Sequence, residues 1–133
     1  MPVRHSGPLL RYTPEVGDAI VRERPIVALE SSVLAQGLPI PANREAATRM
    51  RAAILRHGAT PAITAVVGGE ATLGLTNEEL ERFLAREGVR KLSARDIGPA
   101  LLRGVDGATT VAAALAICRE AGVHVFATGG IGG

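Results

Sequence analysis

The stretch Pro25-Ile26-Val27-Ala28-Leu29-Glu30-Ser31-Ser32 sets the architecture that this chain of 133 residues is expected to adopt. Four consecutive apolar residues after a proline predict a strand buried on both faces, as in a parallel sheet covered by helices. A carboxylate and two hydroxyls follow at once, so Glu30 is expected at the carboxyl end of the strand. Ligands bind at that edge of open α/β sheets, which makes Glu30 the first candidate for chemistry. A helix N-cap or a structural pair with an arginine is the alternative role for this acid.

Strand and helix patterns alternate along the rest of the chain. Strands are predicted at 25–30, 62–67, 71–74, 89–92 and 124–127, and helices at 14–23, 42–57, 97–103 and 111–121. Thr76 and Glu79 match a capping box, which predicts a further helix that ends at Gly88. The alternation implies an α/β fold, a mostly parallel sheet flanked by helices in an α/β/α sandwich with right-handed crossovers.

The length is that of one domain, residues 1–133, in which residues 1–24 form an irregular and then helical lead-in. The last predicted strand runs into the glycine-rich segment 128–133, where the sequence stops. Glycine-rich loops after a strand usually cradle a ligand or turn into a helix. We therefore expect the sandwich to be incomplete. The alternative is a short natural domain with a flexible tail.

Composition excludes several classes of function. Hydrophobic residues make up 47% of the chain but aromatic residues only 2%, and the formal net charge is +2 without an arginine cluster. Nucleic-acid binding is not expected, because the chain has no arginine cluster to neutralise phosphates and almost no aromatic side chains on which bases could stack. No apolar stretch is long enough for a bilayer, and the N-terminus lacks the apolar core of a signal peptide, so we expect a cytoplasmic protein with no membrane partner. A single cysteine, Cys118, excludes an internal disulfide framework or a cysteine-rich metal site.

Two further features point to an anionic ligand. The segment Gly104–Thr110 contains two glycines and opens into the predicted helix 111–121, whose free N–H groups favour a phosphate. Thr109 and Thr110 add hydroxyl donors there, although an ordinary threonine N-cap is the alternative interpretation. Lys91 is the single lysine beside fourteen arginines, which is consistent either with a retained functional ammonium or with composition bias.

Four segments together resemble the pseudouridine-5′-phosphate glycosidase family. They are VALESSVLAQGLPIPANREAA, GATPAITAVVGGEATLGLTNEEL, KLSARDI and GVDGATTVAAALAICREAGVHVFATGGIGG, in the family's order over nearly all of residues 25–133. The combination is far more specific than any one segment. Members of the family are more than twice as long, so the chain resembles their N-terminal half.

The resemblance implies an activity and roles for particular residues. Family members reversibly cleave the C–C glycosidic bond of pseudouridine 5′-phosphate to uracil and ribose 5-phosphate, through ring opening and a lysine Schiff base. The proton-donor glutamate of the family falls on Glu30. Its substrate-binding lysine falls on Lys91, and its helix-start contact falls on Val111, beside Thr109 and Thr110.

The resemblance also implies groups that these residues do not supply. The nucleophilic lysine and the aspartate that binds a divalent metal, typically manganese, lie beyond the final glycines, so no metal ligand is expected in this chain. We expect the chain alone not to turn over substrate and the intact protein to be a homo-oligomer. The alternatives are a phosphosugar- or nucleotide-binding α/β module without glycosidase activity, and a non-functional truncated remnant.

Overall fold

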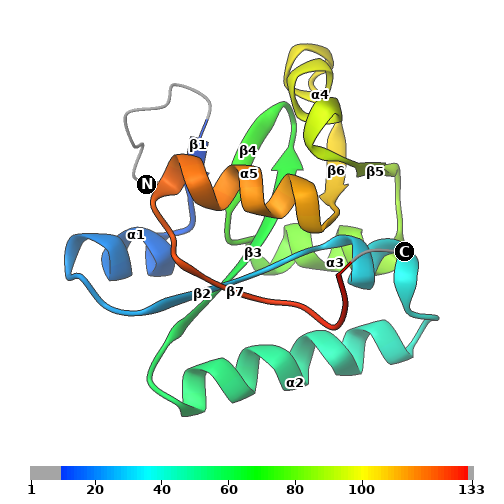
Figure 1. The fold of residues 1–133 in the computed structure, drawn as a ribbon. Coiled ribbons are helices and arrows are strands. Elements are labelled where there is room, and N and C mark those ends of the chain that lie inside the picture. Colours follow the sequence, from blue (N-terminus) through cyan, green and yellow to red (C-terminus); the bar gives the residue numbers. More distant parts are fainter. Residues whose placement is uncertain (1–9, 132–133) are drawn as a thin grey trace.

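The structure is a computed structural model that describes residues 10–131 (Figure 1). Within these residues the strands are β1 (Leu10–Tyr12), β2 (Ile26–Leu29), β3 (Thr60–Val67), β4 (Glu70–Leu73), β5 (Val89–Leu92), β6 (Asp106–Thr109) and β7 (Val125–Ala127). The α-helices are α1 (Pro14–Val21), α2 (Ala42–Arg56), α3 (Asn77–Ala85), α4 (Ile97–Arg103) and α5 (Val111–Ala121). A π-helix, η1 (Val33–Gly37), and a 3₁₀ turn, η2 (Ala94–Asp96), complete the described elements.

The sheet is built around β3, the longest strand. Its first half pairs in parallel with β2, and its second half pairs antiparallel with β4 and with β6. The path β1-β4-β3-β2-β7 places β4 and β2 on opposite sides of β3, so β2 and β6 follow one another along the same side. The β1–β4, β2–β7 and β5–β6 pairs are parallel, which confirms the prediction of a mostly parallel sheet.

Helices cover both faces of this sheet, which confirms the predicted sandwich. Ala62 belongs to a core cluster with Val16 of α1 and Ile117 of α5. Ile63, the next residue along β3, belongs to a second cluster with Ala47 of α2 and Leu80 of α3. Successive side chains of a strand point to opposite faces, so neighbouring residues build two separate cores. Figure 1 shows α5 on one side of the strands and α2 on the other.

Most predicted elements are present with small shifts at their ends. The capping box at Thr76 is confirmed, since its hydroxyl accepts from the Glu79 N–H while the Glu79 carboxylate accepts from the Thr76 N–H. The helix then ends earlier than predicted, at Ala85, because Arg86 adopts the left-handed conformation. The predicted helix 14–23 likewise ends at Val21, and the segment after Glu30, for which no helix or strand was predicted, contains η1.

Two strands were not predicted. The lead-in contains β1, which pairs with β4, and the glycine-containing segment expected as a loop before residue 111 contains β6. The second strand was missed because it contains Gly107, and glycine in a sequence usually indicates a turn. In the sheet it serves close packing instead, since a Cβ on Gly107 would lie 2.1 Å from Cδ1 of Leu92. Among residues 10–131 no helix combines the length and the apolar character needed to cross a membrane.

Candidate active site

Glu30 is the first residue after β2 and lies at the carboxyl end of that strand. The strand β7 pairs in parallel with β2 and ends at Ala127, which is paired with Leu29. Glu30 and Thr128 are therefore neighbours just beyond the ends of the two strands. The Thr128 hydroxyl donates a hydrogen bond of 2.5 Å to Oε1 of Glu30. Glu30 is half-buried, and the hydrogen bond from Thr128 restrains its partly exposed side chain.

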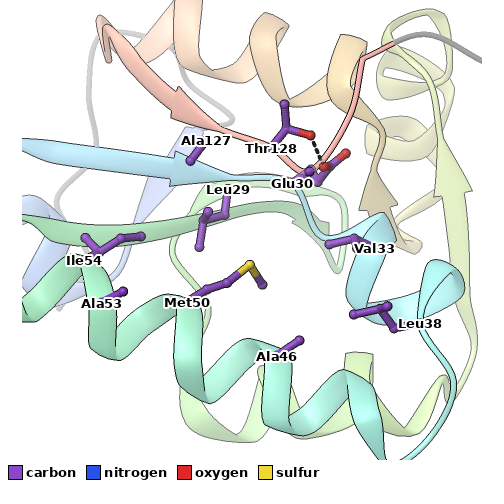
Figure 2. Close-up of a pocket in the computed structure, with 11 residues that line it drawn as sticks. Leu29, Glu30, Val33, Leu38, Ala46, Met50, Ala53, Ile54, Ala127 and Thr128 are labelled. Carbon is purple, nitrogen blue, oxygen red and sulfur yellow. Dashed lines mark hydrogen bonds between the residues drawn. The ribbon is translucent and has the colours of Figure 1, made fainter.

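An apolar cavity of about 400 Å³ opens beside this pair (Figure 2). Its polar side chains belong to Glu30 and Thr128, whereas α2 supplies an apolar wall opposite them. The lining residues are Leu29, Glu30, Val33, Leu38, Ala46, Met50, Ala53, Ile54, Ala127, Thr128 and Gly129. A carboxylate at the edge of such a cavity can meet a ligand with little competing water.

The segment that follows Glu30 is fixed by Asn43, a buried residue in the first turn of α2. Its side-chain amide donates to the carbonyl of Leu34 in η1 at 3.0 Å and to the carbonyl of Leu84 in α3 at 2.9 Å. Sequence analysis missed this residue. A buried amide must find partners, but a single sequence gives no sign of which helical asparagine is buried.

Three fully buried hydroxyls join the strands directly behind Glu30. The Thr109 N–H donates to the Ser31 hydroxyl at 2.8 Å, and the Ser31 N–H donates to the Thr109 hydroxyl at 3.2 Å. The Thr64 and Thr109 hydroxyl oxygens are 2.8 Å apart, and Thr109 also donates to the Thr64 carbonyl at 2.9 Å. This hydroxyl cluster, Ser31, Thr64 and Thr109, joins the end of β2 to the end of β6 alongside β3.

Thr109 was predicted as a ligand donor, but its hydroxyl is enclosed in this cluster and fully buried. Thr110 is the N-cap of α5, and its hydroxyl accepts from the Ala113 N–H at 3.4 Å, as in the alternative interpretation of an ordinary cap. Val111 begins the helix and is half-buried. The start of α5 follows Thr109 directly and therefore lies next to the hydroxyl cluster. Because Thr109 bonds to Ser31, the residue after Glu30, the start of α5 also lies near Glu30.

Lys91 lies on β5, with its side chain exposed. It lines a separate cavity of about 210 Å³ together with Arg90, Arg103 and Asp96. The Ser93 N–H and hydroxyl bind the Asp96 carboxylate and hold its pKa below the ordinary value. The structure thus brings Glu30 near the start of α5, whereas Lys91 faces a cavity that Glu30 does not line.

A metal site does not form among the described residues. No group of three or more His, Cys, Asp or Glu side chains in residues 10–131 could hold a metal ion. The donor set for the manganese that the resemblance implies is therefore not supplied by this part of the chain.

Comparison with known proteins identifies the family. The model of the family described as indigoidine synthase A like protein matches residues 15–133. The chain belongs to this family. Among its relatives, a pseudouridine-5′-phosphate glycosidase of Gemmatimonas aurantiaca is 62% identical over 123 residues, which are 92% of this chain and 40% of the relative. A protein of the same name from Escherichia coli is 46% identical over 130 residues, which are 96% of this chain and 41% of the relative.

Two solved structures share the fold of this chain. A prealnumycin C-glycosynthase, crystallised in complex with ribulose 5-phosphate, matches with a TM-score of 0.84 and 43% identity over 95% of this chain and 40% of the other. An indigoidine synthase A-like protein of Thermotoga maritima matches with a TM-score of 0.83 and 30% identity over 100% of this chain and 43% of the other. The chain thus spans about 40% of the length of these relatives.

Sequence reasoning missed Thr128, Ser31 and Thr64 as parts of the site. Two of them carried a signal. Thr128 follows its strand as Glu30 follows the neighbouring one, and Thr64 carries a hydroxyl inside the otherwise apolar run 62–67. Ser31 directly follows Glu30, but its role could not be predicted, because its partner Thr109 is 78 positions away in the sequence.

Proposed function

We propose that this chain supplies the proton donor of an enzyme that reversibly cleaves the C–C glycosidic bond of pseudouridine 5′-phosphate, and that Glu30 is this donor. The observation that carries the proposal is the half-buried Glu30 carboxylate, hydrogen-bonded to Thr128 at the edge of an apolar cavity. The names of the relatives, which include pseudouridine-5′-phosphate glycosidases and a C-glycosynthase, support the same reaction class.

The chemistry requires an acid at this position. When the bond between uracil and ribose breaks, the departing carbon of the base takes the electron pair and must gain a proton, while water supplies the oxygen of ribose 5-phosphate. Glu30 would deliver that proton and later recover one from water, so that atoms and charge balance. The apolar wall formed by α2 would keep bulk water from competing with the carboxyl group.

The substrate phosphate would bind at the start of α5, near Thr110 and Val111. Backbone N–H groups at a helix N-terminus favour an anion through the helix dipole. Lys91 would add a cation on the β5 side of the same region, since Leu92 pairs with Thr109 in the sheet. We assign Lys91 to binding and the Schiff-base amine to a lysine outside these 133 residues, so the chain by itself would not turn over substrate.

A chimera tests the role of Glu30. The segment of the Gemmatimonas aurantiaca relative that matches this chain is replaced by this chain, and uracil release from pseudouridine 5′-phosphate is followed by chromatography. We expect turnover in the chimera and a loss of kcat by a factor of at least about 100 in Glu30→Gln. Glu120→Gln, which changes an exposed carboxylate of α5, is the matched control. Glu30→Gln turnover equal to that of the control would remove Glu30 from the chemistry.

A phosphosugar-binding module without glycosidase activity is the second candidate. The separation of Lys91 from the Glu30 cavity favours it, because binding at the start of α5 does not require the acid. Calorimetric titration of ribose 5-phosphate into the 133-residue chain tests binding alone. Saturable heat together with an inactive chimera would favour the module, whereas turnover in the chimera would favour the enzyme.

A further inference from the structure

A second cavity, of about 470 Å³, shares no lining residue with the cavity beside Glu30. It lies where the N-termini of α1 and α3 approach the second half of α2 and the start of β3. Its wall contains the polar residues Thr13, Arg51 and Asn77 and the apolar residues Leu55 and Ile63. The Glu30 cavity, by contrast, is almost entirely apolar.

Arg51 gives this second cavity a half-buried positive charge. Among residues 10–131 it takes part in no ion pair, although two other arginines of α2 do: Arg44 pairs with Glu81, and Arg49 pairs with Glu45 at 2.8 Å. A guanidinium that is partly withdrawn from water and lacks a carboxylate partner is well suited to an anion from outside, which it can bind through two parallel N–H donors.

Thr13 adds a hydroxyl to the same wall. It is the N-cap of α1 and only 6% exposed, yet its side chain caps nothing in the first turn. Within the described part of the chain this hydroxyl has no hydrogen-bond partner, whereas the hydroxyls of Thr76 and Thr110 cap their own helices. It lies against Gly74, another wall residue with φ of +96°, where a Cβ would come within 2.3 Å of Oγ1.

Among residues 10–131, the charged side chains that line the cavity are those of Arg51 and Glu15. Glu15 is exposed in the first turn of α1, so solvent screens its repulsion of an anion more than protein screens the attraction of Arg51. The uncapped N-terminus of α1 adds positive potential at the same place. Leu55 and Ile63 form an apolar surface that could hold the body of a small organic phosphate.

We propose that this cavity binds a small oxyanion, either inorganic phosphate or the phosphate group of a monoester, between Arg51, the Thr13 hydroxyl and the N-terminus of α1. The site is independent of the reaction proposed for Glu30, because the two cavities are built from different residues.

Titration of the ¹⁵N-labelled 133-residue chain with sodium phosphate, at constant ionic strength set by sodium chloride, tests the proposal by amide NMR. We expect saturable shifts at the amides of Glu15, Val16 and Asn77. Arg51→Gln should weaken this binding by about tenfold or more. Arg49→Gln removes an equal charge from the same helix at a position outside the cavity and should leave the binding unchanged.

Two further variants and one ligand sharpen the test. Thr13→Val should weaken phosphate binding while the rest of the spectrum stays unchanged, and Glu15→Gln should strengthen it. A phosphate monoester that binds more tightly than inorganic phosphate would identify the organic ligand. Shifts confined to Thr110 and Val111 would support the α5 site alone and overturn this proposal, as would equal effects of Arg51→Gln and Arg49→Gln.

Discussion

At the scale of single residues, the hydroxyl cluster fixes the position of the backbone next to Glu30. Ser31 is the residue after Glu30, and its backbone and side chain both bind Thr109. Buried hydroxyls are costly unless every donor and acceptor is matched. In this cluster they are matched by one another and by the carbonyls of Thr64 and Leu29. The cluster is therefore both a stabilising contact and the support of the candidate acid.

Thr109→Val should destabilise the fold by about 1–3 kcal/mol, because the Ser31 N–H and the Ser31 hydroxyl both lose the Thr109 oxygen in a fully buried place. Valine has nearly the same shape and suits a strand, so packing should change little. Urea unfolding measures the loss. Thr48→Val, at an exposed helical site, is the control and should stay within about 0.5 kcal/mol. Equal stability of the two variants would contradict the role of the cluster.

At the scale of single residues, the sequence predicts a role only where the signal is local. Glu30 could be predicted because it directly follows an apolar strand, a local pattern. The burial of the Thr109 hydroxyl could not be predicted, because it depends on residues in two distant strands. For Thr128 the pattern was available, but its partner is 98 positions away in sequence.

At the scale of elements, hydrophobic periodicity predicted strand and helix positions well wherever the side chains are apolar. It missed β1, whose three residues are too few to show a period, and β6, whose residues Asp106–Thr109 include no large apolar side chain. The β6 segment forms a strand because β5 and β3 flank it, so its conformation is set by tertiary pairing and not by its own propensity.

Gly107→Ala tests this explanation of β6. The added methyl group would meet Leu92 at 2.1 Å and 2.5 Å, so we expect overpacking to cost about 1–3 kcal/mol in thermal or urea unfolding. Gly98→Ala, in α4, is the matched control, because apart from its chain neighbours and the backbone of its own helix no atom lies within 4 Å of the added carbon. The control should be neutral or slightly stabilising. A neutral Gly107→Ala would mean that Leu92 moves aside without cost.

At the scale of the whole molecule, the strands of the sheet differ in how well they are shielded from solvent. The β3 strand lies in the middle, with neighbours on both sides and almost every residue buried. The β7 strand lies at one end of the sheet and pairs, within the described residues, only with β2. Val125 is 55% exposed there. Local opening requires less free energy where few apolar contacts and few neighbours must be lost.

Amides of β7 should therefore exchange with solvent at least about tenfold faster than amides of β3, a difference of about 1.4 kcal/mol in opening free energy. Hydrogen exchange followed by NMR at neutral pH measures both strands in one sample. Strand β6, which has neighbours on both sides, serves as the internal reference and should resemble β3. Equal protection of β7 and β3 in the isolated chain would show that this end of the sheet is covered.

The end-to-end meeting of β2 and β6 along β3 has a consequence for synthesis. Ser31 and Thr109 are separated by 78 positions, and a loop of that span must close before they touch. A nascent chain that has emerged only as far as β4 already contains Glu30, but it has neither β6 nor the amides of α5. Glu30 would thus lack the support of the Ser31–Thr109 hydrogen bonds until β6 and the start of α5 have been synthesised.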